Sequence, residues 1–157
     1  MYDGLVFLCN EGGQKKIKSL SDKDVPVGYS IEKAIKEIEA ISGRIHGLGF
    51  ALTCDWLKEC GCLWLAKPDV HIKRVVSRLK KLPDGKTVSD ADTVAYMYEW
   101  AKAVIDEKID NSVSAYKIDK IIWLLSTGNF YLNNIKFGRD IVYREIELNK
   151  TETASEE

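Results

Sequence analysis

The feature of this sequence that most restricts its fold is the spacing of its apolar residues, which recur every three or four positions in five successive segments. This spacing puts the apolar side chains on one face of an α-helix, so each segment is predicted to be a helix that buries that face. Gly43 is expected to end the first helix in the left-handed conformation. The predicted helices span residues 30–42, 50–60, 70–82, 89–108 and 114–126, the last of them apolar enough to lie in the core.

The chain has 157 residues and is 45% hydrophobic, which suits one domain with its own core better than two. We expect a single helical domain over residues 1–150. The segment Thr151–Glu157 contains three glutamates and no basic residue, so a disordered acidic tail is expected there. Neither a membrane span nor a signal peptide is recognisable, so we expect a cytoplasmic protein without a membrane partner, nucleoid-associated if the organism is bacterial.

The two ends of the chain are harder to interpret. The apolar run Leu5–Cys9 is compatible with a strand or with a turn of helix. Residues 130–137 alternate around Asn133-Asn134, which is typical of a small β-hairpin, and residues 140–148 are predicted to return to helix. The predicted fold class is therefore mainly α, with room for a small C-terminal β-hairpin.

Basic residues are concentrated in the middle of the chain. The formal net charge is −1, so composition alone indicates no nucleic-acid partner. Between residues 43 and 87, however, nine lysines and arginines stand against four acidic residues. The helix predicted for residues 70–82 has Lys73 and Arg74 on its polar side, so a nucleic acid is expected to bind near it.

A short glycine-containing turn, Ile45-His46-Gly47-Leu48-Gly49, separates the first two predicted helices. The backbone N–H groups of such a turn and the positive end of the following helix can hold an anion such as a DNA phosphate. The same glycines are also compatible with a tight helical corner that binds nothing.

Asp69 follows Pro68 and precedes the basic amphipathic helix, which is the ordinary position of an N-cap residue. A carboxylate at a helix N-terminus is kept ionised by the helix dipole. An ionised carboxylate can stabilise a developing sugar cation or activate water at an anomeric carbon. Asp69 is therefore both a predicted cap and a candidate catalytic residue.

The four cysteines do not form a metal-binding pattern. Cys60 and Cys62 are separated by one residue, whereas zinc and Fe–S sites need paired Cys-x-x-Cys or Cys/His spacing. We expect reduced cysteines, no Fe–S cluster and no required cofactor.

Two strings, I-H-G-L-G-F-A-L-T-C-D-W-L from Ile45 and K-P-D-V-H-I-K-R-V from Lys67, resemble the helix-hairpin-helix DNA glycosylase superfamily that includes endonuclease III. That family has a hairpin of the form L-P-G-V-G, a helix, a loop that ends in an essential aspartate, and then D-x-H-x-x-R-V. Gly49 and Asp69 are twenty residues apart, as in endonuclease III. The resemblance extends over residues 30–131, with its motifs between Ile45 and Val75.

The resemblance implies a function and a set of site residues. Asp69 would be the catalytic carboxylate, and double-stranded DNA would be the partner. The backbone carbonyls of Gly43, Ile45 and Leu48 would hold a Na⁺ or K⁺ ion. The DNA-binding residues would be His46, Gly47, Leu48, Gly49, Phe50, Lys73 and Arg74.

Two departures from the family narrow the expected chemistry. Bifunctional members carry a nucleophilic lysine two residues after the second hairpin glycine, and Ala51 stands there in this chain. The family's four-cysteine cluster loop is absent, and residues 129–139 take its place. We therefore expect a monofunctional glycosylase that releases a damaged or modified base from DNA without lyase activity.

Two other readings remain open: a DNA-binding or assembly module without catalysis, and a helical interaction protein without a DNA role. Only about forty-five residues precede the hairpin, so a protein partner or a second copy could complete the site. The base is not specified by the sequence. Aromatic residues that could stack on it are Trp56, Trp64, Trp123, Phe130 and Tyr131.

Overall fold

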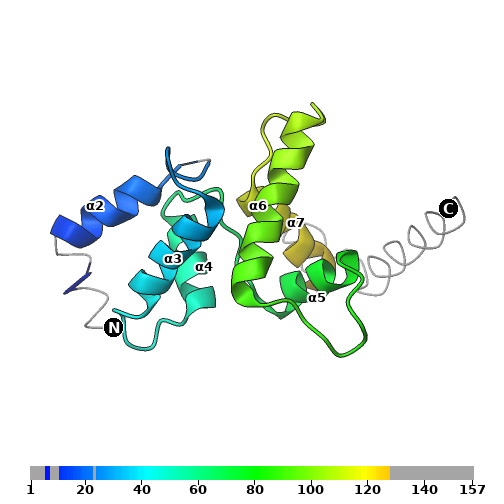
Figure 1. Ribbon diagram of the computed structural model, residues 1–157, viewed down its shortest axis with the longest axis horizontal. Helices are drawn as coiled ribbons and strands as arrows, with labels where there is room; N and C mark the ends of the chain where they lie inside the picture. Colours follow the sequence, from blue (N-terminus) through cyan, green and yellow to red (C-terminus); the bar gives the residue numbers. More distant parts are fainter. Residues whose placement is uncertain (1–5, 8–10, 23, 128–157) are drawn as a thin grey trace, which may run out of the picture.

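The computed structural model describes residues 6–7, 11–22 and 24–127, and this part of the chain is mainly helical without a β-strand (Figure 1). The predicted mainly α class is thereby confirmed. The predicted C-terminal hairpin, the helix at residues 140–148 and the acidic tail lie outside the described residues. The helices are α2 (Glu11–Leu20), α3 (Ile31–Ser42), α4 (Phe50–Glu59), α5 (Val70–Leu79), α6 (Asp90–Asp106) and α7 (Ala115–Thr127).

The five helices predicted from apolar spacing are all present, and side chains fix several of their starts. Ser30 caps α3 by accepting a hydrogen bond from Lys33 N–H, and Ser89 caps α6 by accepting one from Asp92 N–H. Helix α2 was not predicted, because the first thirty residues lack a clear apolar stripe.

Helix α3 ends at Ser42 as predicted, but the backbone conformation of Gly43 and the end of α5 differ from the prediction. Gly43 has a φ of −65° and is right-handed, and the chain reverses four residues later at Gly47, with a φ of +79°. Helix α5 is shorter than predicted, because Lys81 takes a left-handed conformation and Leu82 N–H bonds to Ser77 C=O at 3.0 Å. That bond closes the end of the helix in a Schellman motif.

The described residues form two apolar clusters with α6 between them. The first cluster lies mainly between α3 and α4, and the second between α5, α6 and α7. Helix α6 contributes Val94 to the first cluster and Met97 and Ala101 to the second. The two halves are thus tied together by one long helix (Figure 1).

The connector between α4 and α5 runs through the interior. Trp64 is almost fully buried, and its indole N–H donates to Leu20 C=O at 3.0 Å. Helix α7 buries only one side: Ile118 and Ile122 are in the core, whereas Ile121 is 54% exposed. The expectation that α7 is buried on all sides was therefore wrong, because in the described part of the chain α5 and α6 pack against the face that carries Ile118 and Ile122.

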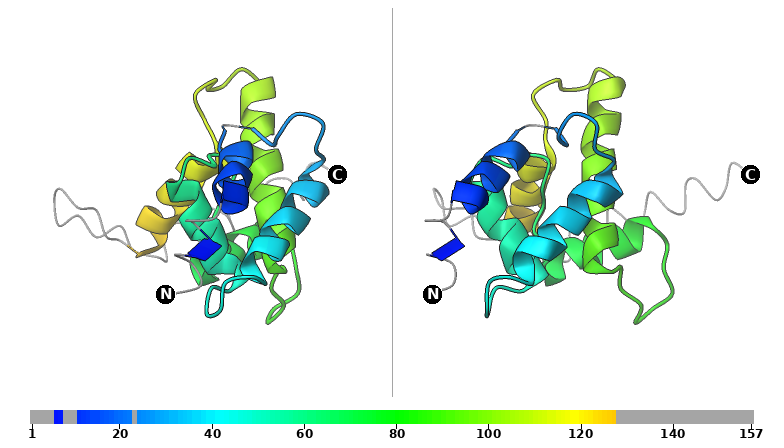
Figure 2. Two further views of the ribbon diagram at one scale, coloured as in Figure 1. Left: turned by 90° about the vertical axis from the view of Figure 1, so that its left-hand side faces the viewer. Right: turned by 60° about the vertical axis from the view of Figure 1, so that its left-hand side comes forward.

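The turn between α3 and α4 and the loop between α5 and α6 project from the same side of the molecule, on opposite halves of its long axis. This is visible in three directions of view, at the bottom of each panel (Figures 1 and 2). Among the helices described, none combines the length and hydropathy that a membrane crossing requires.

Candidate nucleic-acid interface and ion-pair pocket

The turn between α3 and α4 is held by side chains from both helices. Ser42 Oγ donates to Leu48 C=O at 2.9 Å, and Thr53 Oγ1 donates to Gly49 C=O at 3.1 Å. Gly47 needs its positive φ for the reversal, which a residue with a Cβ rarely adopts. The predicted pair of helices joined by a glycine-containing turn is therefore present. Gly47 makes the reversal, and Gly49 is the N-cap of α4.

The start of α4 is open to a ligand. Gly49 is the N-cap, and no side chain among the described residues caps the helix, so the N–H groups of its first turn have no capping side chain there. A Cβ added at Gly47 or Gly49 would meet no described atom within 4 Å. Of the other residues predicted to contact DNA here, His46 is exposed and Leu48 and Phe50 are half-buried. This arrangement suits an anion that approaches the backbone closely.

The three carbonyls predicted to hold an alkali ion lie in this turn, and two of them already accept hydrogen bonds. Ile45 C=O accepts from Leu48 N–H at 3.1 Å, and Leu48 C=O accepts from Ser42 Oγ at 2.9 Å. A carbonyl oxygen has two lone pairs, so these hydrogen bonds do not by themselves prevent contact with a cation. The alkali-ion site, which includes Gly43, stays a prediction.

Asp69 is the N-cap of α5, as predicted. Its Oδ1 accepts hydrogen bonds from His71 N–H at 2.8 Å and from Ile72 N–H at 3.0 Å. Among the described residues no group donates to Oδ2. The carboxylate also lines a pocket of about 310 Å³ between α4, the connector and α7. Asp69 is therefore a capping residue that also lines a pocket.

The wall of this pocket is an ion-pair network that crosses three segments. Lys58 Nζ of α4 lies 2.5 Å from Asp119 Oδ2 of α7, and both side chains are nearly buried, at 4% and 3% exposed. Lys58 also contacts Asp55 at 3.0 Å, and Lys67 Nζ contacts Asp55 at 2.9 Å. Asp119 Oδ2 in addition accepts the backbone N–H of Lys67 at 3.2 Å. The network thereby holds the connector two residues before Asp69.

The two carboxylates of the network titrate differently. Burial raises the pKa of Asp119, and the nearby Asp69 charge adds to the effect, while hydrogen bonds from Lys58 and Lys67 N–H offset only part of it. For Asp55, partial burial opposes ionisation, but hydrogen bonds from Lys67 and Lys58 outweigh it and lower the pKa. Of these two carboxylates, Asp55 ionises more readily than a free aspartate, whereas Asp119 ionises less readily and is favoured as an anion by Lys58.

The aromatic residues that were predicted to stack on a base lie in different parts of the molecule. Trp123 lines the pocket together with Asp69. Trp64 is in the core, and Trp56 packs edge-on against Phe7 with ring centroids 6.4 Å apart. Phe130 and Tyr131 lie outside the described residues.

Sequence reasoning missed the network residues Asp55, Lys58, Lys67 and Asp119. One signal was present: Asp119 stands on the apolar face of its helix, between Ile118 and Ile122. A lone carboxylate on such a face needs a buried partner, because an unpaired buried charge is costly. The partner, sixty-one residues earlier in the chain, is not readable from the spacing.

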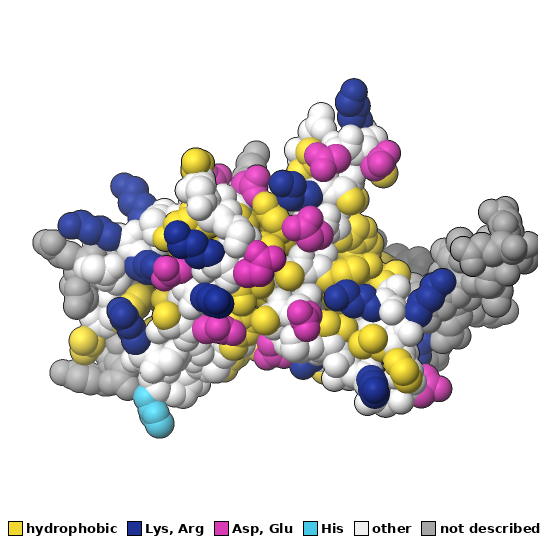
Figure 3. All heavy atoms as spheres, viewed as in Figure 1, with side chains coloured by type: hydrophobic (Ala, Val, Ile, Leu, Met, Phe, Trp, Pro, Cys, Tyr) yellow, Lys and Arg dark blue, Asp and Glu magenta, His cyan; other side chains and the backbone are white. Residues whose placement is uncertain are grey.

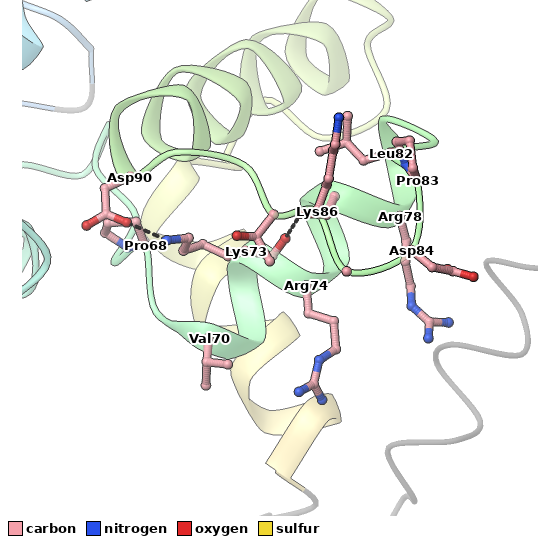
Figure 4. A pocket seen from close by; sticks show the side chains of 13 residues that line it. Pro68, Val70, Lys73, Arg74, Arg78, Leu82, Pro83, Asp84, Lys86 and Asp90 are labelled. Atoms are coloured by element: carbon pink, nitrogen blue, oxygen red, sulfur yellow. Dashed lines mark hydrogen bonds and ion pairs between the residues drawn. The ribbon is translucent and has the colours of Figure 1, made fainter.

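Lys73 and Arg74, the predicted phosphate-binding pair, line a groove beside α5. Lys73 Nζ donates to Asp90 Oδ1 at 2.8 Å, so much of its charge is neutralised within the protein. Arg74 also lines the groove and extends from α5 in another direction (Figure 4). The role of both residues in DNA binding stays a prediction.

Together the fold and these sites define a mainly helical protein with two helices joined by a glycine-containing turn, a groove beside α5, and a pocket lined by three carboxylates and three lysines. Among the described residues no three histidine, cysteine or acidic side chains are placed to hold a metal ion. Comparison with protein-family models, with curated proteins and with solved structures finds no match to this chain.

Proposed function

We propose that this protein is a monofunctional DNA glycosylase of the helix-hairpin-helix type, which hydrolyses the N-glycosidic bond of a damaged or modified base in double-stranded DNA. The observation that carries the proposal is the position of Asp69. Its carboxylate is oriented by two backbone N–H groups at a helix N-terminus and lines a pocket of about 310 Å³. That volume is at the lower end of the range of small-ligand pockets.

The proposed reaction uses the free oxygen of Asp69. A target nucleotide would leave the stack and its base would enter the pocket, where Trp123 offers a surface for stacking. As the bond between C1′ and the base nitrogen breaks, the carboxylate stabilises the positive charge on the sugar. Water then adds to C1′ and gives up its proton, and the base leaves with the electrons of the broken bond and a proton. The products are the free base and an abasic site.

The turn between α3 and α4 would hold the backbone during this step. The N–H groups at the start of α4 are the donors, and the exposed glycines allow a phosphate to approach. Ala51 stands where bifunctional family members have a lysine, so no amine is available there to attack the sugar. This supports hydrolysis without strand cleavage.

The decisive experiment compares wild type with Asp69→Asn on duplexes that carry different base lesions. Asparagine still caps a helix, so the fold should be retained. Base release should fall by about 100-fold or more, as expected for a lost general base, while duplex affinity stays within about twofold. Undiminished base release by Asp69→Asn would overturn the proposal.

The second candidate is a DNA-binding or assembly module without catalysis. It is favoured by the fact that capping α5 already explains Asp69. In that case no lesion duplex loses its base, and Asp69→Asn has no effect beyond stability. Salt-sensitive duplex binding would still depend on Gly47, Gly49, Lys73 and Arg74.

A further inference from the structure

We propose that residues 140–148 form an amphipathic helix that packs into an apolar groove between α5, α6 and α7. These residues lie outside the described part of the chain and follow the end of α7 after a connection of twelve residues. The proposal does not depend on the proposed function, because the groove shares no residue with the hairpin turn or with the pocket of Asp69. It assigns an occupant to an apolar surface that the described residues leave open.

The groove is apolar throughout. Its volume is about 370 Å³, and all eight side chains that line it, from α5, α6 and α7, are apolar. Ile122 is 5% exposed, whereas Ile121 beside it is 54% exposed, so the groove leads from the second apolar cluster out to the surface. Figure 3 shows apolar side chains gathered at the surface beside α6 and above α5. An open apolar surface of this kind is typical of a face that another apolar element covers.

The sequence after α7 contains a helix pattern that suits such a groove. Val142, Tyr143 and Ile146 have the spacing that puts three side chains on one face of a helix. The three charged residues between positions 144 and 147 lie off that face. A helix of nine residues is marginal by itself in water, so this one would need an apolar surface to pack against.

The chain is long enough to bring this helix into the groove. Helix α7 ends at Thr127, two residues after Leu125, which lines the groove. Residues 128–139 can span up to about 40 Å when extended, so the chain can turn back over α7. The lining residues of α7 lie between positions 118 and 125, about 11 Å along its axis, and a nine-residue helix is about 14 Å long. The helix and the groove therefore match in length.

A tethered segment suits this groove better than a second copy of the chain. A stable interface between two proteins takes about 20–30 residues from each side, whereas eight residues line the groove. A helix on the same chain is present at an effective concentration in the millimolar range, so it can dock on a smaller surface. The docked helix would extend the second apolar cluster and stabilise α7.

The test follows amide hydrogen exchange of the full chain by mass spectrometry. In wild type, we expect exchange in residues 142–148 to be at least about 10-fold slower than in a free peptide of the same sequence. Ile121→Glu changes the groove and Ile146→Glu changes the segment, and each should abolish this protection because a carboxylate would have to enter an apolar contact. The control is Ile109→Glu, at a side chain that is 74% exposed and lies outside the groove, and it should keep the protection.

Exchange in α6, followed in the same samples, shows whether each variant folds. Ile146→Glu lies outside all the described helices, so it tests the contact even if Ile121→Glu unfolds. Protection that is independent of protein concentration and is lost in the variants supports the proposal.

Three results would overturn the proposal. The first is no protection of residues 142–148 in wild type, which would leave the groove to another protein. The second is protection that survives in either variant while α6 stays protected. The third is protection that appears only at high protein concentration together with a dimer mass in light scattering, which would indicate a second copy.

Discussion

At the residue scale, Asp69 and Gly49 show how one position can serve both folding and function. One carboxylate oxygen of Asp69 caps α5 by accepting two backbone N–H hydrogen bonds. These two bonds also fix the direction of the other oxygen. Gly49 ends the turn with φ −66° and ψ 167°, a conformation open to any residue. Its lack of a side chain is therefore not required by the backbone.

The variant Gly49→Ala should separate binding from stability. The new methyl group meets no described atom within 4 Å, but alanine is a poorer N-cap than glycine, so stability should fall slightly, by about 1 kcal/mol or less. Duplex affinity should fall about 10-fold or more if a phosphate contacts this backbone, since a lost charge-assisted hydrogen bond costs about 1.5–3 kcal/mol. Thermal unfolding and fluorescence anisotropy measure the two effects.

Gly47→Ala is the matched control. With a φ of +79°, this position strains any side chain, so the variant should lose about 1 kcal/mol of stability. A Gly49→Ala protein that binds the duplex as tightly as wild type would argue against the hairpin contact.

At the scale of elements, α4 links the hairpin to the pocket. Its first residue follows Gly49, and two turns further along Lys58 is buried against Asp119 of α7. The helix therefore fixes the distance between the proposed phosphate site and the pocket. Part of this link depends on a charge pair that lies almost entirely out of water.

Removing one residue of the Lys58–Asp119 pair should lower the free energy of unfolding much more than replacing both residues with apolar ones. Asp119→Ala leaves the ammonium of Lys58 with only Asp55 as a partner, and we expect a loss of about 3–5 kcal/mol in the free energy of unfolding. The double variant Lys58→Met/Asp119→Leu should recover most of that loss, because no unpaired charge remains. Urea denaturation measures both.

The control for this cycle is the exposed pair of Lys120 and Glu59, whose side chains are 46% and 52% exposed. Replacing Lys120 with methionine should change stability by less than about 1 kcal/mol. If Asp119→Ala proved as mild as this control, the buried pair would contribute little to the fold.

At the scale of the whole molecule, the loss of folding stability at low pH should depend in part on Asp55. Its pKa is lower in the folded protein than in the unfolded chain, so the folded state binds fewer protons there. The resulting stability is present above the ordinary pKa of aspartate, about 3.9, and is lost as the pH falls through the lowered value.

The comparison of wild type with Asp55→Asn tests this sign. The free energy of unfolding, measured in urea at several pH values, should fall less steeply with acid in the variant. Lys67→Met, which removes one of the cations that lower the pKa, should change the slope in the same direction. Identical slopes in all three proteins would show that other groups control acid unfolding.

The sequence by itself determined the helices, because their signals are local. Apolar residues at helical spacing, the caps Ser30, Asp69 and Ser89, and the turn glycines act over a few positions along the chain. The prediction was weaker where neighbours decide the outcome. It expected Gly43 to be left-handed, although Gly43 is right-handed and Gly47 has the positive φ, and it placed Ile121 in the core, although this side chain is 54% exposed.

Only the tertiary structure decided which charges meet. Lys58 and Asp119 are sixty-one residues apart, and no local pattern pairs them. Lys73 was predicted to bind DNA, and only the packing of α6 against α5 shows that Asp90 lies beside it. Helix formation depends on interactions between near neighbours in the chain, whereas ion pairs and pockets depend on how helices pack, and packing is set by contacts across the whole sequence.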